Sequence, residues 1–203
     1  MGESRKEQLK EEQTGETRDR AEDKRSRSRD ILSTILYMAL VVLFAYLIIT
    51  FVGQRTRVNG SSMEDTLDNG DNLIVDKISY RFGSPKRFDV VVFPYPRDPS
   101  TFFIKRVIGL PGETVQIDAS GKIYINGQVL EEHFGRETIA DPGLAENPIQ
   151  LGDDEYFVMG DNRNNSMDSR DARVGPIRGK SMVGRALLRI WPLNKIGFVR
   201  HSN

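Results

Sequence analysis

An uninterrupted run of uncharged, mostly apolar residues from Ile31 to Val52 limits what this chain can fold into. About 20 such residues in a helix rise roughly 30 Å, which is the thickness of the hydrocarbon core of a bilayer. A buried soluble helix normally keeps a polar stripe, and this run has none. A cleaved signal peptide would have a shorter apolar core and a small-x-small site after it, whereas Gly53-Gln54-Arg55 follows here. The sequence therefore predicts a single retained transmembrane anchor over residues 31–52.

The segments on either side of this anchor predict its orientation. Residues 1–30 are rich in charged and polar side chains and have almost no large apolar ones, so we expect a disordered tail. Four basic residues precede the anchor (Lys24, Arg25, Arg27 and Arg29), against Arg55 and Arg57 after it. Basic residues stay on the cytoplasmic side of a membrane. We therefore expect a cytoplasmic tail and an extracytoplasmic body over residues 53–203.

The body is predicted to be mainly β. Short apolar runs separated by turn residues predict strands at 73–75, 89–93, 101–110, 115–117, 122–125, 129–130, 155–159 and 186–191. Asp118-Ala119-Ser120-Gly121 predicts a hairpin turn, and Asn126-Gly127 a second one. Residues 113–150 look like a hairpin and loop excursion. The expected fold is an antiparallel β-sheet or barrel-like domain with a small β-hairpin extension.

The composition excludes several kinds of site. Lys and Arg total 29, as do Asp and Glu, so the charge gives no sign of a nucleic-acid partner. No cysteine is present, which rules out disulfides, thiolate zinc sites and cysteine nucleophiles. His133 and His201 are the only histidines, so the chain has few residues from which to build a His-based triad or metal site. If the chain is a hydrolase, its base is not expected to be histidine.

Lys105 lies in the otherwise apolar strand segment 101–110, where lysines are rare. Burial penalises the ammonium form, lowers the pKa from about 10.4 and yields a neutral amine that can act as a base. The alternative is an ammonium that extends to solvent. Strand alternation puts Phe103 and Val107 on the face of Lys105, and Arg106 on the other face, where a carboxylate should pair with it.

Two polar segments contain hydroxyl and other hydrogen-bonding side chains that could react or interact with such an amine. Asn59-Gly60-Ser61-Ser62-Met63 can hold a hydroxyl exposed in a turn, although serine and glycine are also ordinary turn residues. Residues 159–170 (MGDNRNNSMDSR) follow an apolar strand with many hydrogen-bonding side chains. This segment could also be a solvated loop, and a calcium loop is disfavoured because the EF-hand spacing and its closing Glu are missing.

Taken together, these segments resemble the boxes of bacterial type I signal peptidases, the membrane-bound serine proteases that remove signal peptides from exported preproteins. The matching stretches occur in the family's order: Ser-Met-x-x-Thr-Leu from Ser62, the strand box over residues 87–93, Lys-Arg-Val-Ile-Gly-Leu-Pro-Gly-Glu from Lys105, and Gly-Asp-Asn-Arg-x-Asn-Ser-x-Asp-Ser-Arg from Gly160. The resemblance covers the anchor and nearly all of residues 53–203.

The resemblance implies a role for each matching residue. Ser62 would be the nucleophile, Lys105 the general base, and Ser166 a hydrogen-bond partner that orients the Lys105 amine. Asp161 and Asp168 would pair with Arg106 and Arg170 and hold the scaffold. A small apolar substrate pocket would be lined by Met63, Leu67, Phe103 and Ile104. The implied partners are signal peptides and the bilayer of a bacterial cell membrane, with no metal or organic cofactor.

Three positions depart from the family pattern. Asp65 replaces a proline that usually stiffens the turn, and its charge would raise the Lys105 pKa if the two were close. Gly60 stands where some members carry a serine hydroxyl that stabilises the oxyanion, so the Ser62 backbone N–H would need another donor beside it. Asn164 stands where an aspartate is common.

Other functions remain open at this stage. A catalytically inactive, membrane-tethered adaptor or binding module of the same fold is one, and the Asp65 substitution brings it into consideration. Self-cleaving repressors share a related β fold but lack an anchor and carry a DNA-binding region, of which residues 1–30 show no pattern. A conjugation-type or pilus-processing peptidase is the third alternative.

Overall fold

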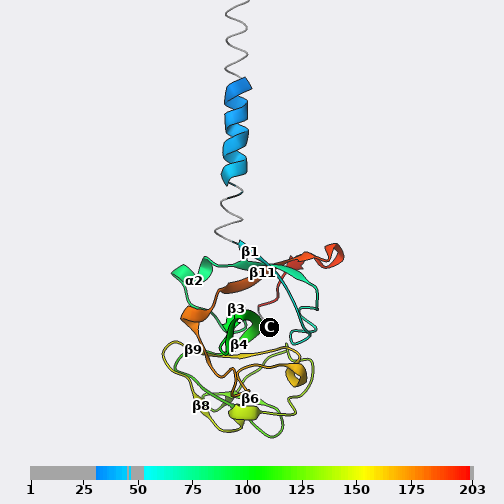
Figure 1. Cartoon of the computed structure of the whole chain (residues 1–203). Helices are drawn as coiled ribbons and strands as arrows, with labels where there is room; N and C mark the ends of the chain where they lie inside the picture. Colours follow the sequence, from blue (N-terminus) through cyan, green and yellow to red (C-terminus); the bar gives the residue numbers. More distant parts are fainter. Residues whose placement is uncertain (1–30, 45, 47–52, 202–203) are drawn as a thin grey trace, which may run out of the picture. The chain divides into compact units, whose positions relative to one another are not determined.

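The computed structural model describes residues 31–44, 46 and 53–201. The chain divides into two compact units, Met1–Ile48 and Ile49–Asn203. In the first unit, residues 31–44 and 46 are helical (Figure 1). Their large apolar side chains are exposed. Within the described ranges, no helix combines the length and hydropathy that a membrane span requires. Residues 45 and 47–52 of the predicted anchor, and the predicted tail over residues 1–30, lie outside the described residues.

The second unit is built mainly from β-strands, as the sequence predicts. The strands are β1 (Gly53–Arg57), β2 (Asn72–Asp76), β3 (Val90–Tyr95), β4 (Asp98–Gly109), β5 (Thr114–Ile117), β6 (Ile123–Ile125), β7 (Gln128–Val129), β8 (Ile149–Gln150), β9 (Glu155–Met159), β10 (Ile177–Arg178), β11 (Gly184–Trp191) and β12 (Gly197–Phe198). Its helices are short: α2 (Ser79–Phe82) and the 3-10 turns η1 (Gly143–Glu146), η2 (Arg163–Asn165), η3 (Gly179–Ser181) and η4 (Leu193–Lys195).

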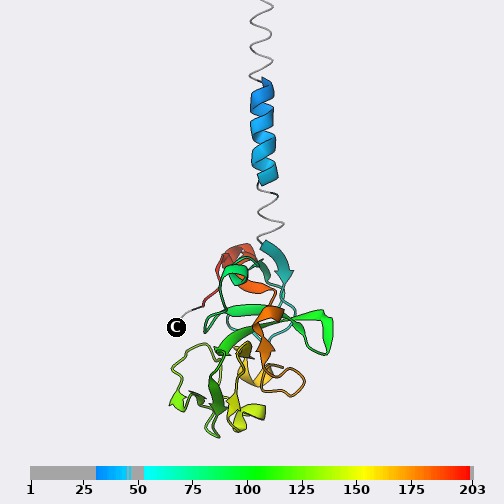
Figure 2. The ribbon, with the colours of Figure 1, turned by 90° about the vertical axis from the view of Figure 1, so that its left-hand side faces the viewer.

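The strands form two antiparallel sheets. In the described part of the chain the larger sheet has the order β1-β2-β11-β3-β4-β9-β10, with β12 beside β11, and its path is open from β1 to β10. The smaller sheet has the order β7-β6-β5-β8. Figure 1 shows β6 and β8 at the end of this unit opposite β1 and β11. The β3–β4 hairpin projects from its side in Figure 2.

Strand β4 lies in the interior of the larger sheet, between β3 and β9. Strand β4 begins at Asp98, three residues before the predicted start. The reason is that β3 continues through Pro94 to Tyr95, which is paired with Asp98. Pro94 is tolerated close to the hairpin end, where the ladder needs fewer N–H donors. In this ladder Lys105 is paired with Val91, and Arg106 with Val90 and Met159. The register therefore fixes both side chains in the middle of the unit.

The smaller sheet accounts for the excursion predicted after residue 113. The pairing of Ile117 with Ile123 closes the predicted hairpin. At the second turn Asn126 and Gly127 both have positive φ, 52° and 79°, as a two-residue hairpin turn requires. One apolar cluster joins this sheet to the larger one, and its buried members come from β4, β5, β6, β9 and the segments before β9: Ile108, Val115, Ile117, Ile123, Ile139, Ala145, Leu151, Phe157 and Met159.

Four short strands have no signal in the sequence: β1, β8, β10 and β12. Strand β1 reads Gly-Gln-Arg-Thr-Arg and is mostly exposed. Edge strands gain their ladder from a neighbour and keep polar side chains in solvent, so periodicity does not reveal them. Pairing with β2 alone defines β1.

Candidate active site

Ser62 lies in a tight turn between β1 and β2 that is held from both sides. Within the turn, the Glu64 and Leu67 amides donate to the Ser61 and Met63 carbonyls. Asn162 holds the turn from outside: its side-chain amide donates to the Ser61 carbonyl (3.1 Å) and its backbone amide to the Ser62 carbonyl (3.1 Å). A serine so constrained has few orientations available, which is the requirement for a preorganised nucleophile.

The Lys105 side chain meets this turn from β4. Its Nζ atom lies 2.6 Å from Ser62 Oγ. Lys105 is only 4% exposed, and burial lowers the pKa of its amine to about 8, although the carboxylates of Asp168 and Asp161 oppose the shift. The Phe103 ring is a further neighbour, with its centroid 5.2 Å from Nζ. At neutral pH a useful fraction of this amine is uncharged and able to accept a proton.

Arg106 extends to the opposite face of β4 and forms a fully buried pair with Asp161. Both oxygens of Asp161 accept from its guanidinium, at 2.8 Å from Nε and 2.7 Å from Nη2. Its Nη1 donates to the carbonyls of Phe88 and Arg200, each at 2.8 Å. Thr66 Oγ1 donates to Asp161 at 2.6 Å, which ties the serine turn to this pair. The bidentate pair therefore joins distant segments beneath the site.

Asp168 and Arg170 form a second buried pair in the segment that follows β9. The Arg170 Nε and Nη2 atoms lie 2.9 and 2.8 Å from the two carboxylate oxygens of Asp168. The Gly160 amide also donates to Asp168, at 3.0 Å. A Cβ atom at Gly160 would overlap Ser166 Oγ and the Ser62 carbonyl. Glycine at this position is what lets the segment after β9 approach the Ser62 turn.

The Ser166 hydroxyl does not make the hydrogen bond to Lys105 that the family resemblance implies. Its Oγ atom is buried and has no hydrogen-bond partner among the described residues. It lies instead against Gly160, next to the Ser62 carbonyl. The Lys105 amine is directed instead to the Ser62 hydroxyl.

A cleft of about 650 Å³ opens beside Ser62 and Lys105. Three of the four expected pocket residues line it: Met63, Phe103 and Ile104. Met167 and Asn165 from the segment after β9 form another part of the wall. Phe103 is stacked on Tyr95, with ring centroids 4.8 Å apart.

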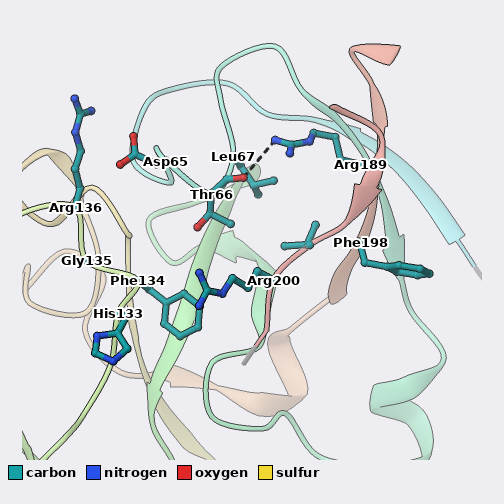
Figure 3. Close-up of a pocket in the computed structure, with 11 residues that line it drawn as sticks. Asp65, Thr66, Leu67, His133, Phe134, Gly135, Arg136, Arg189, Phe198 and Arg200 are labelled. Carbon is teal, nitrogen blue, oxygen red and sulfur yellow. Dashed lines mark hydrogen bonds between the residues drawn. The ribbon is translucent and has the colours of Figure 1, made fainter. Parts of the chain in front are cut away.

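Leu67, the fourth expected pocket residue, is not part of this cleft. It is 1% exposed in the apolar core between β2, β3 and β11, and it borders a separate cavity of about 400 Å³ (Figure 3). Asp65 faces this second cavity as well, with Arg136, Arg189 and Arg200 around it. The short turn after Ser62 puts nearby side chains on opposite sides, so Leu67 and Asp65 point away from the cleft.

Sequence reasoning overlooked several residues that the structure brings to the site. Thr66 belongs to the first motif but had no assigned role, and its hydrogen bond to Asp161 gives it one. Asn162 and Gly160 belong to the last motif and contact the Ser62 turn. Asn165 donates to Ser61 Oγ at 2.8 Å. Their presence in the motifs was the available signal, because each contact spans about a hundred residues that local patterns do not connect.

A family model and the relatives found by sequence agree on one family. A family model described as signal peptidase, peptidase S26, matches residues 31–191. A signal peptidase I of Leptolyngbya laminosa is 42% identical over 175 residues, covering 82% of this chain and 83% of that protein. A probable signal peptidase I-2 of a Synechocystis strain is 40% identical over 168 residues, covering 80% and 74%. The crystal structure of a signal peptidase I from Enterococcus faecalis V583 covers 51% of this chain and 97% of its own, with 33% identity and a TM-score of 0.41.

Proposed function

This chain belongs to the peptidase S26 family of signal peptidases, and we propose that Ser62 is its nucleophile and Lys105 its general base. The observation that carries this assignment is the 2.6 Å contact between Ser62 Oγ and Lys105 Nζ, made by a lysine whose burial lowers its pKa to about 8. A hydroxyl becomes a useful nucleophile when a neutral base stands within hydrogen-bond reach. The family's reaction is the removal of signal peptides by a serine peptidase, and this pair supplies both the serine and its base.

The proposed reaction has two halves. Neutral Lys105 accepts the Ser62 proton while the alkoxide attacks the carbonyl carbon of the residue before the cut. The ammonium then gives its proton to the leaving amine as the peptide bond breaks, and an acyl-enzyme remains on Ser62. In the second half Lys105 takes a proton from water as its oxygen attacks the ester carbon. The bond to Ser62 Oγ then breaks, the ammonium returns its proton to that oxygen, and the signal peptide leaves with a free carboxylate. These steps call on no metal or organic cofactor.

Ser166 acquires its role in this scheme once Lys105 is protonated. The ammonium has three N–H donors, and Ser62 is then engaged with the substrate. The Ser166 oxygen is buried and has no hydrogen-bond partner in the described structure, and we assign it as the acceptor of one of these donors. Asp161 with Arg106, and Asp168 with Arg170, act through the backbone segments that they hold together. We therefore assign these five residues supporting rather than chemical roles.

The cleft beside Ser62 is the proposed binding site for the segment before the cut. Met63, Phe103 and Ile104 give it an apolar lining. Such a wall favours small uncharged side chains at the positions that face it, such as alanine. The exposed part of β4 before Phe103 offers main-chain groups to an extended substrate.

The activity test compares Ser62→Ala and Lys105→Ala with the parent chain, solubilised in detergent, on a preprotein. Each variant should lose at least about 1,000-fold in turnover, because dyad members act as a unit. Ser181→Ala and Lys180→Ala are matched controls, since both residues lie in η3, away from the cleft. Near-normal turnover of either dyad variant would refute the assignment. A parent chain without turnover would instead favour the inactive adaptor.

We further propose that residues 31–52 anchor the enzyme, with residues 1–30 in the cytoplasm and residues 53–203 as the extracytoplasmic catalytic domain of a bacterial cell membrane. The exposure of every large apolar side chain of the helical residues 31–44 supports a lipid environment.

Single cysteines can test this topology, because the chain has none of its own to interfere. Thr14→Cys places a thiol in the tail, and Ser181→Cys places one at an exposed position of η3. Membrane-impermeant thiol reagents should label Ser181→Cys and spare Thr14→Cys in intact cells. The reverse pattern would overturn the proposed orientation, and labelling of both would argue against a span between them.

A further inference from the structure

The catalytic scheme requires two donors for the oxyanion that forms when Ser62 attacks. The Ser61 carbonyl accepts from Asn162. In a planar trans peptide the N–H of the next residue points the opposite way, so the Ser62 amide is directed away from Asn162. In the described part of the chain this amide donates to no backbone acceptor. It is therefore available as the first donor.

The position two residues before the nucleophile cannot supply the second donor. Gly60 has no side chain, and a Cβ atom built there would meet nothing within 4 Å. Its φ of 112° also lies in the region that L-residues avoid, so the turn depends on glycine at this position. A side chain at this position therefore cannot donate, which leaves the other groups that border the cleft as candidates for the second donor.

Ser61 is the side chain that meets this requirement. It lines the same cleft as Ser62 and Asn165. Its Oγ atom accepts a hydrogen bond from the Asn165 side-chain amide at 2.8 Å. A hydroxyl that accepts still has its own hydrogen to donate, and among the described residues no acceptor takes it. Accepting from an amide also polarises the O–H bond and strengthens it as a donor.

From these contacts we infer that the Ser61 hydroxyl, oriented by Asn165, is the second oxyanion donor and a catalytic residue of the reaction. This inference rests on the proposed function of Ser62 and Lys105. In the ground state the donor binds the substrate carbonyl weakly. It stabilises the charge that develops on the carbonyl oxygen, so its contribution belongs to kcat rather than to KM.

The test is steady-state cleavage of a preprotein by the full-length chain in detergent. Ser61→Ala should lower kcat by about 100-fold with little change in KM, as loss of one oxyanion donor does elsewhere. Ser61→Thr keeps the hydroxyl and should recover most of the loss. Asn165→Ala should lower kcat by a smaller factor, and by no further factor in a chain that already carries Ser61→Ala, because Asn165 acts through Ser61.

Two results would overturn the inference. One is a kcat of Ser61→Ala equal to that of the parent chain, and the other is an equal loss in Ser61→Thr and Ser61→Ala, which would point to packing rather than to the hydroxyl. Ser62→Ala separates this question from the proposed function. If Ser62→Ala still cleaves, the dyad itself is refuted; if it is dead while Ser61→Ala is normal, only the donor assignment fails.

Discussion

Ser62 Oγ and Lys105 Nζ lie 2.6 Å apart although 43 positions separate the two residues in the sequence. The turn after β1 supplies one and the middle of β4 the other. Strand β4 is fixed on both sides by β3 and β9, and the turn is fixed by Asn162 and Thr66. The short distance is thus imposed by the surrounding scaffold rather than by either segment alone.

The pH dependence of cleavage should report the Lys105 amine. Only its neutral form accepts the Ser62 proton, and burial lowers its pKa to about 8. Activity should therefore fall as pH decreases through about 8 and level off above it. The measurement is kcat/KM of the full-length chain against pH. A midpoint near the value of a free lysine, about 10.4, would contradict a desolvated base.

Lys105→Met should make the protein more stable at neutral pH while abolishing cleavage. The folded-state pKa of about 8 lies below that of an unfolded lysine, about 10.4. Below pH 8 the folded parent chain holds Lys105 as a buried ammonium, which is more stable in water. The resulting loss in the free energy of unfolding is fully present below pH 8 and disappears as pH rises towards 10.4. At pH 7 we expect the removal of the buried charge to raise the free energy of unfolding by about 1–3 kcal/mol. The loss of the contact with Ser62 subtracts from this gain.

Chemical denaturation of the detergent-solubilised chain at pH 7 and pH 10 measures this difference. The difference in free energy of unfolding between Lys105→Met and the parent should be smaller at the higher pH. Lys180→Met is the matched control, since Lys180 lies in η3 at the surface and is not a buried residue. A gap that stays constant with pH would mean that packing, not charge, causes it.

Asp161→Asn should destabilise the fold by about 3–5 kcal/mol, because Arg106 would keep a buried charge without its carboxylate. Activity should fall too, since Thr66 would lose a charged acceptor that holds the serine turn. Asp171→Asn is the comparison: the Arg173–Asp171 pair lies at the surface, where water screens it, so its loss should lower the free energy of unfolding far less. Equal losses of free energy of unfolding in the two variants would refute the larger contribution assigned to the buried pair.

Gly160→Ala should abolish cleavage even where the variant still folds. Its Cβ atom would overlap Ser166 Oγ and the Ser62 carbonyl, so the nucleophile would have to move, and small displacements of reacting groups are costly. Gly197→Ala is the control, because a Cβ atom there meets nothing within 4 Å. The readout is kcat of both variants, together with their thermal midpoints. Normal turnover of Gly160→Ala would show that the site tolerates this shift.

Asp65→Asn should leave the pH profile unchanged. Asp65 faces the second cavity, and the charges that act on the Lys105 pKa are those of Asp168, Asp161 and Arg170 (Figure 3). The negative charge that replaces the family's proline therefore does not interfere with the base. A shift of the kinetic midpoint to lower pH in this variant would mean that the two groups interact.

The family, the strand-rich body and the residue types of the site could all be predicted from the amino-acid sequence. Alternating apolar side chains and turn residues are local signals, which is why β2, β5, β6 and β9 were predicted close to their observed bounds. An unusual lysine in an apolar strand was enough to single out Lys105. The edge strands β1 and β12 were missed because their pairing, and not their composition, defines them.

Which of these residues meet could be seen only in the folded chain. It brought Lys105 to Ser62 and Arg106 to Asp161, moved Leu67 into the core, and left the Ser166 hydroxyl without the expected hydrogen bond. The physical reason is that a motif fixes the types of side chain, whereas the direction of each one depends on the packing of segments that lie far apart in the chain. In a turn only a few residues long, neighbouring side chains face different cavities. No local sequence pattern predicts which cavity each side chain faces.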